Sequence, residues 1–151
     1  MPEVVVRVDL MSLDCFQTEI IVSTRGKGTY EITDQIESFV SECDVSTGQI
    51  TVFLRHTSAS LVIMENADPS ARDDLHSFFD NIVPDNLPYL VHTYEGPDDS
   101  PSHLKMALTR TAEVIPISEG RTVLGTWQGV FVFEHRVSPH RRKITLSVIG
   151  K

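Results

Sequence analysis

The chain has 151 residues, of which 40% are hydrophobic, and a formal net charge of −8. This length suits one domain with a substantial core, so we expect a single domain over 1–151. The hydrophobic content excludes a disordered chain, and no apolar run approaches the roughly 20 residues that a membrane span needs. The negative charge opposes binding to nucleic acids or anionic membranes.

The cysteines and the start of the chain bear on cellular location. Cys15 and Cys43 form no CxxC pair, and the short acidic segment at 1–4 has no signal-peptide pattern. Both features are typical of a cytoplasmic protein with reduced thiols. We therefore expect free cysteines that pack in the fold rather than carry redox chemistry.

Apolar periodicity predicts strands and one helix in the first part of the chain. A strand is expected over 16–23, followed by a glycine-containing turn at 25–28. Apolar residues at helical spacing then predict a helix with Thr33 as its N-cap, and Gly48 ends that unit. Two further strands are expected at 49–55 and 59–64.

The second helix has a clear start signal. Asp68 can accept a hydrogen bond at the N-cap, and Pro69 suits the first helical position. His76 lies among polar neighbours in mid-helix and is expected at the surface, and Pro84 closes the helix. The buried stripe predicted from the helical spacing is Leu75, Phe78, Phe79 and Ile82.

The second half of the chain contains the same kinds of helix-start and turn signals. Ser100 and Pro101 cap a third helix, in which Leu104, Ala107 and Leu108 should face inward. Further strands, with a turn at 118–120, are expected at 113–117, 122–126, 129–134 and 143–149. Hairpin-like neighbours outnumber βαβ units, so we expect an α+β fold with a compact, mostly antiparallel β-sandwich-like core and about three helices.

Polar side chains are dense around His56, which follows a strand and precedes Thr57 and Ser58. A second polar group at 65–69 follows, just before the second helix. Converging donors and ligands of this kind suit a site for a phosphate or a metal. An equally consistent alternative for His56 is a strand-end histidine whose ring is satisfied by a backbone carbonyl.

His103 is expected at the start of the third helix. If Ser100 is the N-cap, the ring lies in the first turn, where the helix dipole disfavours imidazolium. A neutral imidazole is what a metal ligand or a general base requires. Turn and cap chemistry explains Asp98 and Asp99 in part, but it does not explain the flanking histidines, which include His92. The spacing matches no standard zinc pattern, so spacing alone is a weak metal signal.

Two further segments could carry binding groups. Trp127 lies between Gly125 and Gly129, which favours a β-bulge with a core tryptophan slightly over a ring that stacks on a ligand. The basic segment 134–143 is either an exposed hairpin tip or an anion pocket in which arginines bind a phosphate. Glu134 beside it could be a base, a metal ligand or an arginine partner.

Five motifs occur in an order that resembles the YjbQ family, whose members are called secondary thiamine-phosphate synthases. Each motif is modest alone, but together they are specific and cover the chain from about Gln17 to Gly150. After Leu108 this sequence differs from the family pattern, which often has a glycine near Arg110 and a more apolar strand at 111–114. The motifs are HTSAS at 56–60, ENADP at 65–69, EGPDD with PSHLK at 95–105, LGTWQG at 124–129, and EHR with PHRR at 134–142.

The resemblance implies an α+β fold and a homotrimer with the site close to subunit contacts. It also implies a weak, secondary activity that joins hydroxymethylpyrimidine diphosphate to thiazole phosphate and releases pyrophosphate. A divalent metal, zinc or magnesium, would be held by His56, His92 and His103. Asp99 and Glu134 would be the nearby carboxylates.

The implied reaction breaks a carbon–oxygen bond to a diphosphate, so charge on the leaving oxygens must be neutralised. We expect His56 and His103 to hold the metal or transfer protons, and Glu134 to orient one of them. The substrate-binding residues expected from the motifs are Asn66, Asp99, Gln128, Arg141 and Arg142.

Two other functions remain open. The chain could be a different metal-dependent enzyme on a phosphorylated metabolite, or a non-catalytic trimer that binds a metal or a metabolite. In each case the partner is a small molecule rather than a nucleic acid or a membrane. No GxGxxG, P-loop, GxSxG or HExxH motif occurs, which removes the common nucleotide and hydrolase signatures.

Overall fold

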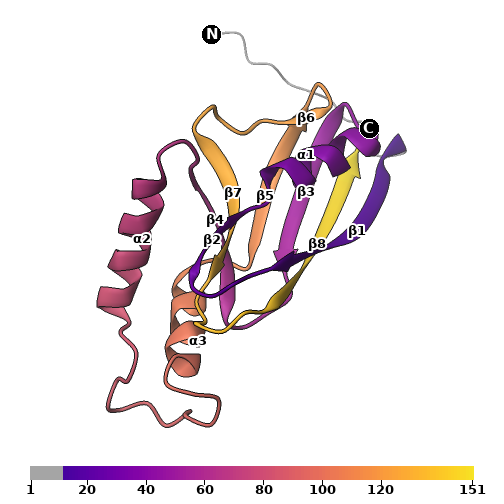
Figure 1. Cartoon of the computed structure of the whole chain (residues 1–151). Coiled ribbons are helices and arrows are strands. Elements are labelled where there is room, and N and C mark those ends of the chain that lie inside the picture. Colours follow the sequence, from indigo (N-terminus) through magenta and orange to yellow (C-terminus); the bar gives the residue numbers. More distant parts are fainter. Residues whose placement is uncertain (1–11) are drawn as a thin grey trace.

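The computed structural model describes residues 12–151 and places them in two antiparallel sheets and three helices, which confirms the expected α+β fold (Figure 1). The larger sheet contains, in spatial order, β1 (Asp14–Ser23), β8 (Arg141–Gly150), β3 (Thr47–Leu54), β5 (Ala112–Ser118) and β6 (Arg121–Thr122). The smaller sheet contains β2 (Gly28–Glu31), β7 (Gln128–Glu134) and β4 (Ala59–Glu65). The helices are α1 (Thr33–Glu42), α2 (Pro69–Ile82) and α3 (Asp99–Leu108). In this part of the chain, no helix combines the length and the hydrophobicity needed to cross a membrane.

The core lies between the two sheets and α1. Side chains alternate along β8, so Ile144 and Leu146 are buried on its inner face. Val132 faces them from the smaller sheet, and Ile36 and Val40 of α1 complete the cluster. Burial of each such side chain stabilises the fold by about 1.5–3 kcal/mol.

Strand β7 is buried on both faces, which explains its nearly unbroken apolar run. Val132 faces the core, whereas Phe133 faces α2. There Phe79 stands edge-on to Phe133 with ring centroids 5.4 Å apart, and His76 does the same at 4.8 Å. His76 is therefore half-buried, and the prediction that it lies at the surface is wrong.

The buried stripe predicted for α2 is only partly right. Asp68 caps the helix as predicted, since its Oδ1 accepts a hydrogen bond from the backbone N–H of Ser70. Phe79 is half-buried, and so is Leu75. However, Phe78 and Ile82 are exposed, because only a narrow face of the helix meets β7.

The prediction for α3 fails more clearly. Its N-cap is Asp98 rather than Ser100, and the apolar residues expected to face inward are exposed, namely Leu104, Ala107 and Leu108. Its buried residues are Asp99, Pro101, Ser102 and Lys105. Buried polar residues are invisible to an argument from apolar spacing, and here they find partners on other segments.

Three smaller boundaries also differ from expectation. The N-cap of α1 is Ile32, and Thr33 is the first helical residue. The predicted strand at 122–126 shrinks to β6. Gly48 lies inside β3, where a Cβ atom would come within 2.2 Å of the backbone oxygen of Ile149, so only glycine fits.

The other face of the larger sheet points away from the core. Apolar side chains are 41–55% exposed on four neighbouring strands, namely Ile21, Ile149, Phe53 and Val114. Cys15 lies on the same strand as Ile21. Both cysteines are free, as expected, although Cys15 is exposed and only Cys43 is buried.

Candidate metal centre

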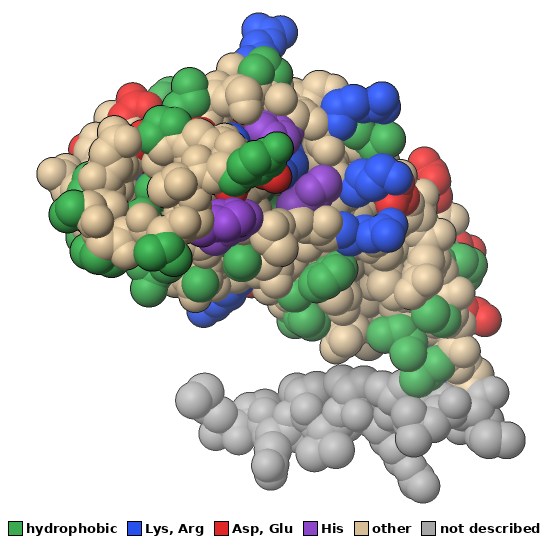
Figure 2. Space-filling view, turned by 90° about the horizontal axis from the view of Figure 1, so that it is seen from below, with side chains coloured by type: hydrophobic (Ala, Val, Ile, Leu, Met, Phe, Trp, Pro, Cys, Tyr) green, Lys and Arg blue, Asp and Glu red, His purple; other side chains and the backbone are tan. Residues whose placement is uncertain are grey.

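One end of the molecule gathers the ionisable residues that the sequence singled out. It is formed by α3, by the segment 83–98 before it, and by the link between β7 and β8, at the bottom of Figure 1. Seen from this end, histidine side chains lie beside several lysine and arginine side chains (Figure 2). His92 lies on the segment 83–98. Asp99 and His103 lie on α3, and their spacing of four residues puts them on one face of the helix.

The carboxylate of Asp99 lies between two imidazoles. Its Oδ2 atom is 2.9 Å from Nε2 of His92 and 3.4 Å from Nε2 of His103. One ligand atom from each of these residues lies within 4.8 Å of the others. The Asp99 side chain is only 2% exposed, and its Oδ2 is buried without a hydrogen-bond partner. Three atoms with metal-ligand chemistry therefore converge on one point.

The tautomer of His103 suits a metal ligand. Its Nδ1 lies 2.6 Å from the backbone oxygen of Thr57. Because a carbonyl can only accept, Nδ1 carries a proton, and in the neutral ring Nε2 is the nitrogen with the lone pair. This arrangement is usual for metal-ligating histidines. The helix-dipole argument does not apply, because α3 begins at Asp99 and His103 lies beyond its first turn.

A buried arginine holds the other oxygen of Asp99. Nη1 of Arg136 pairs with Asp99 Oδ1, Nε lies 3.2 Å from Asp98 Oδ2, and Nη2 donates to the backbone oxygen of Glu95 at 2.9 Å. Burial raises the pKa of Asp98, but hydrogen bonds from the Val137 backbone and from Arg136 outweigh burial and hold it below its ordinary value. Asp98 is therefore ionised at neutral pH in this network.

A second arginine–carboxylate pair lies beside the first. Arg142 donates to Glu134 from Nε at 2.7 Å and from Nη2 at 2.5 Å, and Thr24 and the Arg136 backbone donate to the same carboxylate. Burial raises the pKa of Glu134, but these donors outweigh it, so the pKa lies below its ordinary value. Arg142 also contacts Ser58 and is buried. Of the three roles considered for Glu134, this geometry matches the arginine partner.

His56 stands apart from the group formed by His92, Asp99 and His103. Its Nε2 accepts a hydrogen bond from the backbone N–H of Lys143 at 2.8 Å. Burial, followed by the positive charge of Arg142, lowers the pKa of His56, so the ring is neutral. The ring is thus satisfied by the backbone, although by an amide rather than by the expected carbonyl.

The chain is similar to several known proteins. Residues 18–151 match the family model described as UPF0047 protein YjbQ-like. A UPF0047 protein from Synechocystis sp. is 47% identical over 89% of this chain and 92% of its own length. The UPF0047 protein YjbQ of Salmonella typhimurium is 42% identical over 90% of this chain and 99% of its own length.

The chain belongs to the YjbQ-like UPF0047 family. Solved structures of the family share its fold. A YjbQ/UPF0047 protein from Clostridium acetobutylicum has a TM-score of 0.80 at 32% identity, covering 87% of this chain and 98% of that one. A YbjQ-like protein from Sulfolobus solfataricus has a TM-score of 0.82 at 26% identity, covering 93% of this chain and all of that one.

Two of the family-motif residues lie far from the histidines. Asn66 and Gln128 are at the opposite end of β4 and β7, roughly 20 Å along the strand. There Nδ2 of Asn66 donates to the backbone oxygens of Thr126 and Gln128. Trp127 in this turn is 65% exposed, so the expected core tryptophan is wrong. The two polar groups at 56–60 and 65–69 do not converge within one chain.

The arginines of the basic segment divide into two kinds. Arg142 and Arg136 are buried and paired with carboxylates, whereas Arg141 is exposed. Within residues 12–151, Arg141 forms no ion pair or hydrogen bond with another side chain. Of the two arginines expected to bind phosphate, it alone has a free guanidinium.

The sequence argument missed two functional-looking residues next to Glu134. His135 is buried, its Nε2 lies 2.9 Å from Ser60 Oγ, and burial lowers its pKa to about 3. Arg136 was quoted only as part of a motif. The available signal was the apolar run of β7, which is typical of a strand buried on both faces and ends directly before these two residues.

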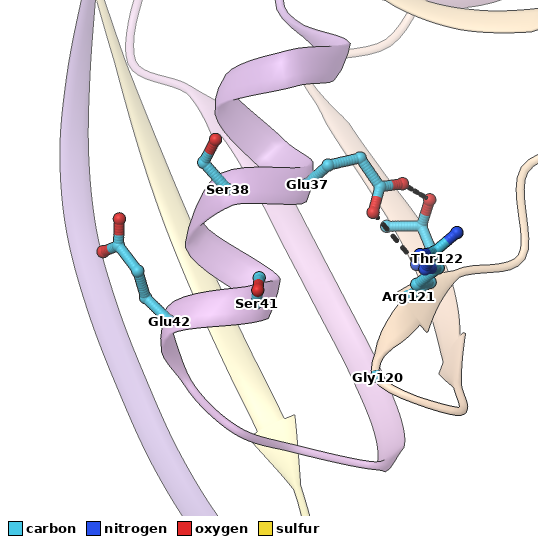
Figure 3. A pocket seen from close by; sticks show the side chains of 7 residues that line it. All are labelled: Glu37, Ser38, Ser41, Glu42, Gly120, Arg121 and Thr122. Atoms are coloured by element: carbon cyan, nitrogen blue, oxygen red, sulfur yellow. Dashed lines mark hydrogen bonds between the residues drawn. The ribbon is translucent and has the colours of Figure 1, made fainter.

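A hollow elsewhere on the molecule lacks the groups that make a metal site. It has a volume of about 770 Å³ and lies between α1 and the turn after β5, away from α3. Glu37 accepts a hydrogen bond from the Thr122 hydroxyl inside it (Figure 3). Its lining residues are Glu37, Ser38, Ser41, Glu42, Gly120, Arg121 and Thr122, which include no imidazole or thiol.

Proposed function

We propose that the chain is a divalent-metal-dependent enzyme that acts on a phosphorylated small molecule, with thiamine-phosphate synthesis as its specific reaction. The observation that carries this proposal is the buried, unpartnered Oδ2 of Asp99. It faces Nε2 of both His92 and His103, one of which has a free lone pair. A carboxylate oxygen that is buried without a hydrogen-bond donor is costly unless a cation lies beside it.

The donor set and the charges favour a divalent ion. Two imidazoles and one carboxylate suit zinc, and a three-ligand site leaves a position open for water or substrate. The carboxylates of Glu95, Asp98 and Asp99 surround one guanidinium, that of Arg136. Acidic side chains therefore outnumber the arginine in this cluster, which favours a bound cation.

The exposed cations at the same end support an anionic substrate. Arg141 has a free guanidinium, and guanidinium forks bind phosphate bidentately. Nε2 of His56 is occupied by the Lys143 backbone, so Nδ1 carries the proton and is a hydrogen-bond donor. We assign Arg141 and His56 to the phosphate. Arg142 and Glu134 hold the surrounding segments in place.

In this reaction the thiazole ring nitrogen supplies the electron pair for a new carbon–nitrogen bond to the methylene carbon of the pyrimidine. The carbon–oxygen bond to the diphosphate breaks, and pyrophosphate leaves with that bond's electron pair. The bound metal would supply Lewis-acid stabilisation of the leaving oxygens. His92, Asp99 and His103 would hold the metal, while Arg141 and His56 donate hydrogen bonds to the departing phosphate. Each donor is useful to the extent that it binds the leaving group more tightly than the substrate.

We further propose that the chain assembles as a homotrimer. The exposed apolar side chains on the outer face of the larger sheet, such as Phe53 and Val114, support a contact between copies. Asn66 and Gln128 are too far from the histidines of their own chain, so in a trimer they would act on a neighbour's site. Light scattering should give three chains per particle, and Phe53→Glu should reduce that number. A monomeric wild type would contradict the assembly.

The activity is tested with metal-free protein. Pyrophosphate release from hydroxymethylpyrimidine diphosphate and thiazole phosphate should require added zinc or magnesium. His103→Ala should abolish metal binding and turnover, whereas His76→Gln, on α2, should keep both if thermal unfolding shows that it folds. A kcat/KM near 10⁴ M⁻¹s⁻¹ would mark thiamine phosphate as the main product, and a far lower value would favour another phosphorylated substrate. Failure of the wild type to bind any divalent metal would contradict the proposal.

A further inference from the structure

We infer that Arg136 is the positioning residue of the metal centre: it holds one oxygen of Asp99 so that the other faces the metal. This role rests on the metal site proposed above. It concerns a residue that contacts neither the metal nor the substrate and acts only through Asp99.

The geometry supports this role because every nitrogen of the guanidinium donates a hydrogen bond. Each of its three nitrogens has its own acceptor, on Asp98, Asp99 or Glu95. The side chain is 10% exposed, so it has little freedom to move. A planar fork with fixed donor directions can hold three acceptors at once, which a lysine ammonium on a flexible stem cannot reproduce.

The Arg136 contact also restricts how Asp99 can bind. A free carboxylate can rotate about its last bond or offer both oxygens to one ion. With Oδ1 paired to Arg136, only Oδ2 remains, and it already points between the rings of His92 and His103. The arrangement predicts monodentate ligation by Oδ2.

Arg136 further connects the segments that carry the ligands. Its backbone N–H donates to Glu134 at 3.1 Å, which ties it to the end of β7. Its side chain reaches Asp99 at the start of α3 and the backbone of Glu95, in the segment that carries His92. One side chain therefore fixes the relative position of segments that are distant in sequence.

The test is a double-mutant cycle on cobalt binding, since Co²⁺ reports its ligands through visible absorption. Arg136→Lys should weaken Co²⁺ binding by about 10- to 100-fold, the usual cost of losing an outer partner of a ligand, and should change the spectrum. In an Asp99→Ala background the same change should have no further effect, because the residue acts through Asp99. Arg110→Lys, an exposed arginine paired with Glu113, is the matched control and should change nothing.

Three results would overturn this role. The first is a wild-type affinity and spectrum in Arg136→Lys. The second is the same loss of affinity with and without Asp99, which would mean a merely structural effect. The third is a metal-loaded wild-type crystal structure with Asp99 bidentate and Arg136 displaced, a measurement that does not depend on whether Arg136→Lys folds. If the wild type binds no metal at all, the proposed function fails as well, and the wild-type titration alone identifies that case.

Discussion

Two buried arginine–carboxylate clusters lie side by side and differ in one respect. The closed cluster consists of Glu134, Arg142, Thr24 and Ser58, and the open cluster consists of Asp99, Arg136, Asp98, His92 and His103. In the closed cluster both carboxylate oxygens accept hydrogen bonds, from Arg142 and two further donors. In the open cluster one oxygen of Asp99 is saturated by Arg136, and the other has no hydrogen-bond partner.

The two carboxylates are chemically similar, but their hydrogen bonding suggests a structural role for Glu134 and a functional role for Asp99. A buried carboxylate with every lone pair satisfied holds segments together and has nothing left to offer. A buried carboxylate with one oxygen free of hydrogen bonds is costly, and that oxygen is available to a ligand. In the closed cluster, Arg142 on β8 holds Ser58 of the HTSAS segment in place. In the open cluster, His103 contacts the backbone oxygen of Thr57 in the same segment.

The largest effect expected is on the stability of the closed cluster. Glu134→Gln should lower the free energy of unfolding by about 3–5 kcal/mol, because it leaves the charge of Arg142 buried without its partner. Asp99→Asn should cost less, since Arg136 keeps Asp98 and Glu95. Urea denaturation in the presence of a chelator measures both. Equal losses in the two variants would remove the distinction between the clusters.

The next effect separates the clusters by metal affinity. Asp99→Asn should weaken binding of zinc or cobalt by more than about 100-fold, or about 2.7 kcal/mol, because it removes a charged ligand. Asp80→Asn is the control, since Asp80 also pairs with a buried cation, Lys105, but lies outside the open cluster. Calorimetric titration of the folded variants checks the prediction. An unchanged affinity in Asp99→Asn would exclude Asp99 as a ligand.

Acid should lower the free energy of unfolding because His135, next to the closed cluster, is buried in its neutral form. Burial lowers the pKa of His135 from 6.5 to about 3, so below pH 6.5 the unfolded chain binds a proton that the folded chain does not. Stability is therefore full above pH 6.5 and falls as the pH drops towards 3, by about 2 kcal/mol at pH 5. His135→Gln should flatten this part of the profile of the apo-protein, leaving the smaller share of His56 and His76, whose pKa values are also lowered by burial. An unchanged slope in the variant would show that His135 is not the group that titrates.

The smallest effect concerns the exposed cation beside the two clusters. Arg141→Ala should raise KM for the phosphorylated substrate by about 10-fold, or about 1.4 kcal/mol, while metal affinity and unfolding stay at wild-type values. Steady-state kinetics with Arg110→Ala as the control measures it. A loss of stability in place of a KM effect would place Arg141 with the structural arginines.

The sequence predicts much of this fold because its apolar residues keep the right period. The α2 cap at Asp68 and most strands of both sheets follow from local patterns that the structure confirms, although β2 was not predicted and β6 is shorter than expected. The inward faces of α2 and α3 could not be predicted in the same way. Their packing depends on single partners such as Phe133 for α2, and α3 buries polar groups such as Lys105, which pairs with Asp80.

The candidate site was only partly predictable for the same reason. Asp99 and His103 are four residues apart on one helix, so local spacing brings them together. His92 was noted as a flanking histidine, but only the family resemblance made it a metal ligand. No local rule predicts that Arg136, 37 residues from Asp99, reaches that carboxylate, or that a Lys143 amide occupies His56.

The central claim is that a divalent cation lies between two imidazoles and the free oxygen of Asp99. Anomalous diffraction at the zinc edge, from crystals soaked in zinc, tests it most directly. A peak should appear within about 2.0–2.2 Å of Nε2 of His92, Nε2 of His103 and Oδ2 of Asp99. A zinc-loaded crystal with no peak between these atoms, or with its peak at His56 instead, would contradict the account.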